Sequence, residues 1–81
     1  MIIFVNGCFD ILHRGHIELF RWAQSLGNQL IVGVDSDEKV KRDKGFKRPF
    51  NCLEDRMMMI RALRYVDKVA SFNTKEELED L

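Results

Sequence analysis

Three short apolar runs constrain the fold of this 81-residue chain more than any other feature. Residues 2–6, 30–34 and 66–72 are rich in β-branched and aromatic side chains, which favour strands. The first run has no polar alternation, so we expect that strand to be buried on both faces, as in a parallel sheet. Gly7 then ends this strand, because glycine weakens strand structure.

The segments between these runs predict helices. Residues 15–26 repeat apolar side chains at helical spacing, and Gly27 favours a helix end there. Asn51 and Glu54 resemble a capping box that starts a second helix over residues 52–64. The core-facing side chains predicted by the spacing are Ile17, Phe20, Ala23 and Leu26 in the first helix, and Leu53, Met57, Ile60 and Leu63 or Arg64 in the second.

Three further segments complete the pass along the chain. Residues 35–50 are polar, basic and irregular, and we expect a loop there. The methionine run 57–59 is interpreted as core filler, since methionine adapts to irregular gaps. Thr74, followed three residues later by Glu77, predicts the start of one more short helix.

Strands that alternate with helices predict an α/β fold with a Rossmann-like parallel sheet, in the order β-α-β-α-β. Ligands of such sheets bind beyond the carboxyl ends of the strands. A chain of 81 residues forms one domain at most and buries a modest core. We therefore look for function where the first strand ends.

Charge and composition exclude several classes of partner. The 13 basic and 13 acidic residues balance, so net charge indicates neither nucleic acid nor a membrane. No apolar run approaches the roughly 20 residues that span a bilayer. Because there are two cysteines and no visible signal peptide, we expect a cytoplasmic protein with reduced thiols.

Basic residues are nevertheless concentrated in one part of the chain. A run of this kind, taken alone, is typical of a solvated loop or helix face. Asp43 is its only acidic member. The basic residues of the run are Lys39, Lys41, Arg42, Lys44, Lys47 and Arg48.

Two histidines stand three residues apart at the predicted start of the first helix. This spacing places His13 and His16 on one helix face, and Gly15 between them leaves room for a close approach. A helix N-terminus offers free N–H groups and partial positive charge, and imidazoles add further donors. The pattern indicates a phosphate site that stabilises developing negative charge without a nucleophile.

Other interpretations of this segment remain open. The histidines could form part of a metal site with Cys8 or Cys52, but no fourth ligand has a recognisable spacing, so we predict no protein metal site. They could also be incidental to an ordinary helix start. Cys8 is the one candidate nucleophile, and no base is assigned to it.

The run from Gly7 to His16 resembles the G-x-F-D-x-x-H-x-G-H signature of the cytidylyltransferase-like nucleotidyltransferase superfamily. Glycerol-3-phosphate cytidylyltransferase is similar, with a loop of different length. Further segments are similar to the adenylyltransferase domain of ADP-heptose synthase, and the similarity covers essentially the whole chain. These segments are Ser36-Asp37, Lys41 to Gly45, Arg48-Pro49, Asn51, Leu53 to Arg56 and Val66 to Val69.

The resemblance implies a reaction and a set of partners. A substrate phosphate attacks the α-phosphate of a nucleoside triphosphate in line, pyrophosphate leaves, and no covalent enzyme intermediate forms. The implied partners are therefore ATP or CTP and a phosphorylated small molecule such as a sugar or polyol phosphate. Mg²⁺ is expected to bind mainly through the phosphates, since it prefers few protein ligands.

The resemblance also assigns roles to individual residues. It implies that His13, His16 and Lys44 are catalytic, and that Lys41 or Lys44 contacts phosphates from a flexible loop. The nucleotide-binding residues that it implies are Gly7, Cys8, Phe9, Asp10, His13, Gly15, His16, Lys41 and Lys44.

Three charged residues have two interpretations each. Asp10 borders the nucleotide in the family, or it orients the histidine turn or caps its helix. Arg56 and Asp67 contact ligand directly, or they form a structural ion pair or support the site from behind.

The family has a second half, with a serine/threonine-rich motif at another helix N-terminus, and no such motif occurs in residues 1–81. We therefore expect a single nucleotidyltransferase-like domain that is truncated on its C-terminal side. Two alternatives to an active enzyme follow: a non-catalytic nucleotide-binding module, and a fragment whose exposed strand edge is covered by another copy. Family members are commonly dimers, so a homo-oligomer is expected.

Overall fold

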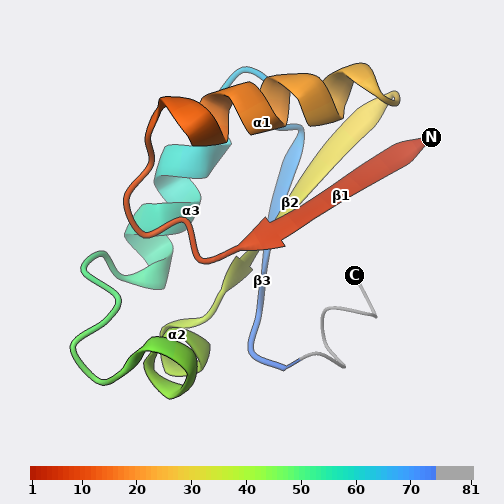
Figure 1. Ribbon diagram of the computed structural model, residues 1–81. Coiled ribbons are helices and arrows are strands. Elements are labelled where there is room, and N and C mark those ends of the chain that lie inside the picture. Colours follow the sequence, from red (N-terminus) through yellow and green to blue (C-terminus); the bar gives the residue numbers. More distant parts are fainter. Residues whose placement is uncertain (75–81) are drawn as a thin grey trace.

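A three-stranded parallel sheet forms the centre of the molecule, as the sequence predicts (Figure 1). The computed structural model describes residues 1–74. The strands are β1 (Ile2–Gly7), β2 (Gln29–Asp35) and β3 (Lys68–Phe72), in the spatial order β1-β2-β3. The fold is therefore α/β and Rossmann-like, and β2 is its central strand.

Both crossover helices pack on the same face of the sheet. Helix α1 (Arg14–Ser25) contacts β1 and β2, and α3 (Leu53–Arg61) contacts β2 and β3. Alternate side chains of β2 point toward them and are fully buried, as the period of a strand requires. The buried cluster formed in this way comprises Phe9, Phe20, Ala23, Leu30, Val32, Val34 and Ile60.

The other face of β1 is exposed, so the prediction that this strand is buried on both faces was wrong. Ile3 and Val5 pack against the core, whereas Ile2 is 62% exposed and Phe4 is 37% exposed. Phe4 reaches across Gly33 of β2, where a Cβ would lie 2.7 Å from Cζ of the ring. The β1 run is apolar on both faces, but no element within residues 1–74 covers the second one.

The segment expected to be a loop contains a helix, α2 (Asp37–Lys44). Ser36 caps it by accepting a hydrogen bond from the backbone N–H of Lys39. Acidic residues lie in the first turn and basic residues in the last, which suits the helix dipole. The cap and the charge order are visible in the sequence, but only Val40 of this helix is buried, so hydrophobic periodicity could not reveal it.

Helix α3 differs from its prediction in three ways. Its N-cap is Cys52 rather than Asn51, because the Asn51 side chain bonds elsewhere, and it ends at Arg61 rather than residue 64. Met57 packs against the core, as predicted. Met58 and Met59 are 65% and 60% exposed, so they do not fill the core.

The remaining boundaries agree closely with the prediction. Helix α1 begins one residue earlier than expected and buries Phe20 and Ala23, whereas Leu26 is its C-cap and is half exposed. The short helix predicted after Thr74 lies outside the described residues. None of the helices in residues 1–74 is long and apolar enough to span a membrane.

Candidate functional site

The turn between β1 and α1 is held by its own two histidines. Nδ1 of His13, the N-cap, accepts a hydrogen bond from the Gly15 N–H at 3.0 Å. Nδ1 of His16 accepts from the His13 N–H at 3.2 Å, so the two imidazoles form a reciprocal capping box. The rings lie side by side, with centroids 4.0 Å apart. The predicted pairing of these residues on one helix face is confirmed.

These hydrogen bonds decide what the imidazoles can offer to a ligand. A nitrogen that accepts a backbone N–H carries no proton, so in each neutral ring the proton lies on Nε2. The two Nε2–H groups of His13 and His16 are then free to donate outward. Burial, together with the charge of His13, lowers the pKa of His16 below its ordinary value of 6.5, which favours the neutral donor over the imidazolium.

The histidines also change the expected source of the donors. We expected backbone N–H groups of the helix start to bind phosphate directly. The N–H groups of His13 and Gly15 are instead occupied by imidazole nitrogens. The Nδ1 atoms of the imidazoles accept the hydrogen bonds of these two N–H groups, and the Nε2–H groups of the same rings become the available donors.

The two glycines of the motif make room for aromatic rings. A Cβ at Gly15 would lie 2.7 Å from Cε1 of His13, so any other residue would displace the capping ring. A Cβ at Gly7 would lie 2.9 Å from Cζ of Phe9, which folds back from a left-handed backbone conformation with φ of 51°. Phe9 in turn packs edge-on against His16, with ring centroids 5.4 Å apart. The sequence suggested that Gly15 leaves room for a ligand, but in the structure the His13 ring occupies this room.

Asp10 holds a distant segment against the histidine turn. Its carboxylate accepts hydrogen bonds from the backbone N–H groups of Phe50 at 2.7 Å and Asn51 at 2.8 Å. Arg48 approaches the same carboxylate to 3.4 Å, and Nδ2 of Asn51 donates to the Asp10 carbonyl at 2.6 Å. Burial opposes ionisation, but these donors and the arginine together lower the pKa of Asp10. Asp10 therefore organises the loop before α3, and it does not cap α1.

Arg56 lies at the centre of the same network. Its side chain has no exposed surface, and its guanidinium donates to the carbonyl of Cys8 at 2.8 Å and of Asn51 at 3.0 Å. A third hydrogen bond, at 2.7 Å, joins it to the carboxylate of Asp37 at the start of α2. Arg56 thus connects the end of β1, α2 and the loop before α3, which is the supporting role that the sequence left open.

Asp67 lies away from this network, so it does not form the ion pair with Arg56 that was one expectation. Its carboxylate accepts from the Leu30 N–H at 2.7 Å, and its own N–H donates to the Leu30 carbonyl at 3.0 Å. Leu30 is in the first half of β2, whereas Arg56 contacts the residue that follows β1. Asp67 therefore fixes the entry to β3.

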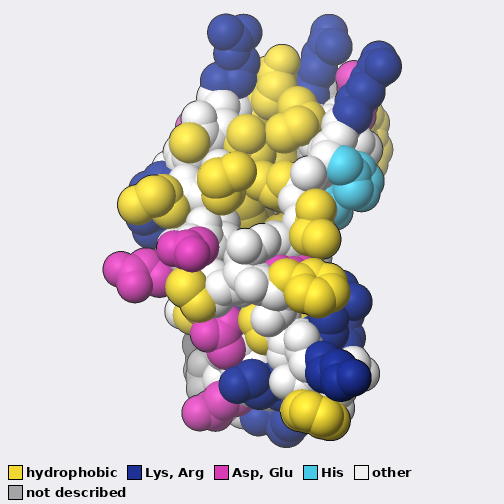
Figure 2. All heavy atoms as spheres, turned by 90° about the vertical axis from the view of Figure 1, so that its left-hand side faces the viewer, with side chains coloured by type: hydrophobic (Ala, Val, Ile, Leu, Met, Phe, Trp, Pro, Cys, Tyr) yellow, Lys and Arg dark blue, Asp and Glu magenta, His cyan; other side chains and the backbone are white. Residues whose placement is uncertain are grey.

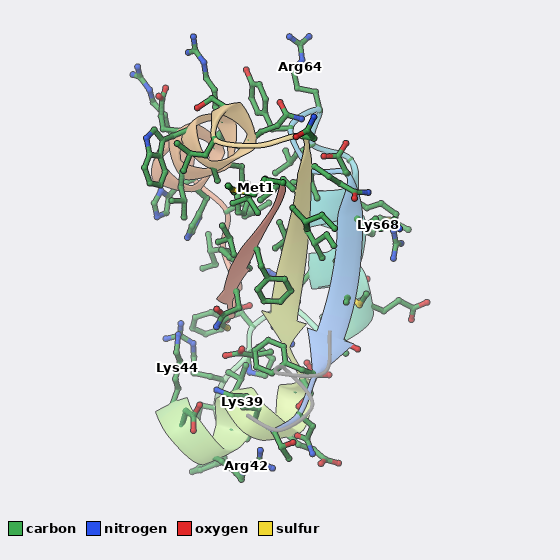
Figure 3. All side chains as sticks on the ribbon, turned by 90° about the vertical axis from the view of Figure 1, so that its right-hand side faces the viewer. Met1, Lys39, Arg42, Lys44, Arg64 and Lys68 are labelled. Carbon is green, nitrogen blue, oxygen red and sulfur yellow. The ribbon has the colours of Figure 1, made fainter. Side chains whose placement is uncertain are left out.

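Four residues of the basic run lie on α2, beyond the carboxyl ends of the strands: Lys39, Lys41, Arg42 and Lys44. Figure 3 shows Lys44 on the side of β1 and Arg42 pointing away from the sheet. Lys39 is engaged by Asp43 at 2.7 Å and Asp35 at 3.5 Å. Its hydrogen bond to Asp43 raises the pKa of Lys39, although burial opposes this. Lys41 and Lys44 are exposed and belong to a capped helix, which corrects the prediction that they lie on a flexible loop.

The remaining candidates define the limits of the site. Cys8 is buried beside Arg56, and Cys52 is exposed, so the two thiols lie in different environments. Within residues 1–74, no three His, Cys, Asp or Glu side chains converge as a metal site would require. A hollow of about 390 Å³ lies between the loop after β1 and α3. Figure 2 shows histidine side chains, in cyan, beside an area of hydrophobic side chains, in yellow.

Sequence reasoning missed Arg48, which lies in the basic run but pairs with Asp10 and stacks over Phe50 at 4.6 Å. It also missed the role of Asn51, whose side chain donates to the Asp10 carbonyl and does not cap α3. No local pattern could have shown either contact, because the partners are about 40 residues apart in the chain.

Comparison with known proteins places this arrangement among relatives. Residues 4–80 match a family model described as cytidylyltransferase-like. The bifunctional protein HldE of Helicobacter hepaticus is 49% identical over 78 residues, which are 96% of this chain and 16% of that protein. HldE of Haemophilus influenzae is 52% identical over 71 residues, which are 88% of this chain and 15% of that protein. This chain thus spans about one sixth of the length of these relatives.

A solved structure shares the fold. The crystal structure of the lipopolysaccharide core biosynthesis protein from Thermoplasma volcanium matches with a TM-score of 0.86 and 26% identity. The match covers 99% of this chain and 64% of that chain. The arrangement of strands and helices described above is therefore shared with a longer protein.

Proposed function

Because this chain belongs to the cytidylyltransferase-like family of nucleotidyltransferases, we propose that it forms the phosphate-binding wall of such an enzyme. The proposed reaction transfers a nucleotidyl group from ATP or CTP to a sugar phosphate or polyol phosphate and releases pyrophosphate. The proposed acceptor is most like that of a heptose-phosphate adenylyltransferase. This choice of acceptor is supported by the resemblance to ADP-heptose synthase at Ser36-Asp37 and from Lys41 to Gly45, around the two ends of α2.

The observation that carries this proposal is the fixed tautomer of the two histidines. With Nδ1 of His13 and His16 engaged by backbone N–H groups, both Nε2–H donors belong to neighbouring rings whose centroids are 4.0 Å apart at the start of α1. Donors fixed before the substrate arrives stabilise charge without reorganisation, which is the main protein contribution to phosphoryl and nucleotidyl transfer.

The chemistry proposed for this site needs no protein nucleophile. An oxygen of the acceptor phosphate forms a bond to the α-phosphorus, the bond to the β-phosphate oxygen breaks, and pyrophosphate leaves with that electron pair. The Nε2–H groups of His13 and His16 donate to phosphate oxygens on which negative charge grows. Cys8 takes no part, because it is buried against Arg56.

Lys41 and Lys44 are proposed to contact the phosphates of either substrate from α2. Their support is their exposure and their position in the last turn of a helix beyond the carboxyl ends of the strands. Lysine suits this task as a compact point charge on a long stem. Because Lys39 is engaged by two carboxylates, it is not included.

Mg²⁺ is proposed to bind mainly through the triphosphate, where it would neutralise charge on the phosphate oxygens. The described residues fit this role because the buried carboxylate of Asp10, beside the histidine turn, is already engaged by two backbone N–H groups and by Arg48. Mg²⁺ usually keeps several waters and takes few protein ligands. We further propose that the protein acts in the cytoplasm, where Cys8 and Cys52 would stay reduced.

Nucleotide binding and turnover test this proposal separately. Calorimetric titration with ATP and with CTP, in the presence of Mg²⁺, is expected to show binding that His13→Asn weakens at least roughly tenfold, because Asn keeps the cap and removes the Nε2–H donor. Pyrophosphate release from each nucleotide is then measured with heptose phosphate, glycerol phosphate and other sugar or polyol phosphates as acceptors.

The outcomes distinguish the alternatives. Nucleotide binding with pyrophosphate release supports an active nucleotidyltransferase. The nucleotide and acceptor that give the fastest release are then its preferred substrates among those tested. Binding without release from any pair, by a chain shown to be folded, contradicts catalysis by this form and supports a nucleotide-binding module. Equal binding by the wild type and His13→Asn would overturn the assignment of the site itself.

A further inference from the structure

The loop that joins α2 to α3 exposes two phenylalanine rings. Phe46 is 82% exposed and Phe50 is 65% exposed, whereas Phe9, Phe20 and Phe72 are buried. Neither of the two exposed rings lines the hollow beside α3. The proposed function assigns the phosphates of both substrates to histidines and lysines, but it assigns no residue to the sugar or polyol that carries the acceptor phosphate. An exposed aromatic ring beside a phosphate site is a candidate for that contact.

Phe50 is held in place by two separate contacts. Its backbone N–H donates to the Asp10 carboxylate at 2.7 Å, and Asp10 belongs to the turn that leads into the two histidines. The Arg48 guanidinium lies over the Phe50 ring, 4.6 Å from its centroid, and approaches the same carboxylate to 3.4 Å. A side chain that is fixed before the ligand arrives loses little freedom on binding, which favours stacking on this ring.

Phe46 has the same side chain in the same loop but lacks these contacts. Within residues 1–74, no aromatic ring or cation stacks on Phe46. Ordering such a side chain costs conformational entropy when a ligand binds. Phe50 is therefore the better platform for a ligand, and Phe46 is its matched control.

The charged side chains of this loop are cationic donors. Lys47 is exposed and forms no ion pair with another residue of the described part of the chain. The Arg48 side chain is 37% exposed, and its Nε has no hydrogen-bond partner within residues 1–74, so charge and stacking hold the guanidinium in place. Figure 2 shows, at its lower right, hydrophobic side chains next to Lys and Arg side chains. Such a surface suits a ligand that combines an apolar face with negative charge.

We propose that Phe50, with Arg48 behind it, is the platform on which the sugar ring of the acceptor stacks. This inference rests on the proposed function, and it selects cyclic sugar phosphates over open-chain polyol phosphates. The C–H groups on one side of a sugar ring carry partial positive charge, so the negative face of an aromatic ring attracts them. An open-chain polyol phosphate presents no such flat face and gains the charge contacts alone.

A sugar phosphate fits this platform better than a nucleobase does. Bases also stack on aromatic rings, but the edge of a base presents hydrogen-bond donors as well as acceptors. Arg48 and Lys47 supply donors only, and the many oxygen atoms of a sugar phosphate can accept from them. The loop also begins directly after Lys44, which is proposed to contact phosphates.

NMR titration of the 81-residue chain with three probes tests this proposal. Mannose 1-phosphate is the cyclic probe, glycerol 3-phosphate is the open-chain probe, and inorganic phosphate reports the charge contacts alone. We expect mannose 1-phosphate to bind about fivefold more tightly than glycerol 3-phosphate, because contact with an aromatic face contributes roughly that factor. Phe50→Leu keeps an apolar side chain and removes the aromatic face. This preference should then fall to within about twofold, while the affinity for glycerol 3-phosphate stays unchanged.

Two further variants show whether the fixed ring is responsible. Phe46→Leu makes the same change in the same loop, and it should leave the preference for mannose 1-phosphate at the value of the wild type. Arg48→Lys keeps the charge but loses the planar guanidinium that stacks on the ring, so the preference should fall by about twofold. In the wild type, nuclear Overhauser contacts should join the Phe50 ring protons to C–H protons of mannose 1-phosphate. Circular dichroism would show that every variant remains folded.

Several outcomes would overturn the proposal. A folded chain that binds neither organic probe contradicts it outright, and so does equal affinity for mannose 1-phosphate and inorganic phosphate. The same holds for a preference that survives Phe50→Leu, for one that Phe46→Leu removes, and for the absence of Overhauser contacts to the Phe50 ring. If Phe50→Leu weakens binding of ATP or CTP and leaves mannose 1-phosphate binding unchanged, the ring belongs to the nucleobase.

Failure of the proposed function would look different. It would appear as nucleotide binding that is absent or independent of His13, measured without any acceptor. The preference between mannose 1-phosphate and glycerol 3-phosphate is measured without any nucleotide, so each result can be obtained whatever the other shows.

Discussion

The histidine turn and the loop before α3 lie against each other, but they are held in opposite ways. His13 and His16 cap their own helix through contacts between residues two or three apart. The loop around Asn51 is held by Asp10, which is 41 residues away in the chain, and by Arg56, which also binds the Cys8 carbonyl 48 residues away. A local motif can lose one member and keep its fold, whereas a buried network of this kind is expected to fail as a unit.

The largest effect is expected when Arg56 is replaced by Met. The change leaves the carbonyls of Cys8 and Asn51 without their donor and leaves the Asp37 carboxylate without its ion-pair partner. Breaking a buried charge network in this way costs about 3–5 kcal/mol in the free energy of unfolding. Urea denaturation monitored by circular dichroism would measure the loss.

Two comparisons keep this first prediction decisive. Arg61→Met changes an exposed arginine of the same helix, and its effect should stay within about 0.5 kcal/mol. Arg56→Lys keeps the charge but loses the fork of donors, so its stability should fall between the wild type and the Met variant. Equal stability of the Arg56 and Arg61 variants would mean that the long-range network does not hold the loop.

A smaller loss is expected for Asp10→Asn, which removes the charge and one of the two acceptor oxygens. The N–H groups of Phe50 and Asn51 then share one oxygen, and Arg48 loses its ion pair. We expect a loss of about 1–2 kcal/mol and faster hydrogen exchange at these two amides. Asp55→Asn, which removes an exposed carboxylate of α3, should leave their exchange unchanged; similar rates in the two variants would contradict the role of Asp10.

The same contrast explains what could be predicted from the sequence. The α/β order, the strands and the pairing of His13 with His16 follow from short-range patterns, and the structure confirms them. Helix α2 was missed because its single buried side chain, Val40, leaves no apolar period, although Ser36 and the order of charges mark its ends. The cap, rather than the hydrophobic spacing, was the informative feature there.

The errors at α3 have a different physical cause. Asn51 has the residue type and spacing of a helix cap, but it binds Asp10 instead of α3. Its backbone N–H donates to the Asp10 carboxylate, and its side chain donates to the Asp10 carbonyl. Met58 and Met59 adjoin a core methionine in the sequence, yet the helix turns them outward. Such outcomes depend on which distant groups a segment meets, and no local pattern contains that information.

The histidine turn should be less sensitive, and a pair of substitutions separates its two tasks. His13→Ala removes the cap of α1 and should cost about 1 kcal/mol, whereas His13→Asn, with a strong capping side chain, should stay within about 0.5 kcal/mol of the wild type. Thermal and urea denaturation would measure both. If His13→Asn is as destabilising as His13→Ala, the imidazole stabilises the turn by more than its hydrogen bond to Gly15.

The smallest effect is a pH dependence that arises from His16. Burial, with a contribution from His13, lowers the pKa of His16 in the folded protein below its ordinary value of 6.5. The unfolded chain therefore binds the proton more readily, so the contribution to stability is complete above about pH 6.5 and is lost as the pH falls through the lower, folded pKa. Protonation of Nδ1 would also break the hydrogen bond from the His13 N–H.

Urea denaturation at a series of pH values from about 7.5 to 5 would measure this dependence. The matched variant is His16→Gln, because Gln at this position of a capping box can still accept from the His13 N–H and does not titrate. Its stability should change less than that of the wild type over this range. Asp10 does not interfere, since its pKa is lowered from 3.8 and so lies below the range. An unchanged slope in His16→Gln would show that the reciprocal cap does not depend on a neutral imidazole, and the fixed Nε2–H donor would lose its physical basis.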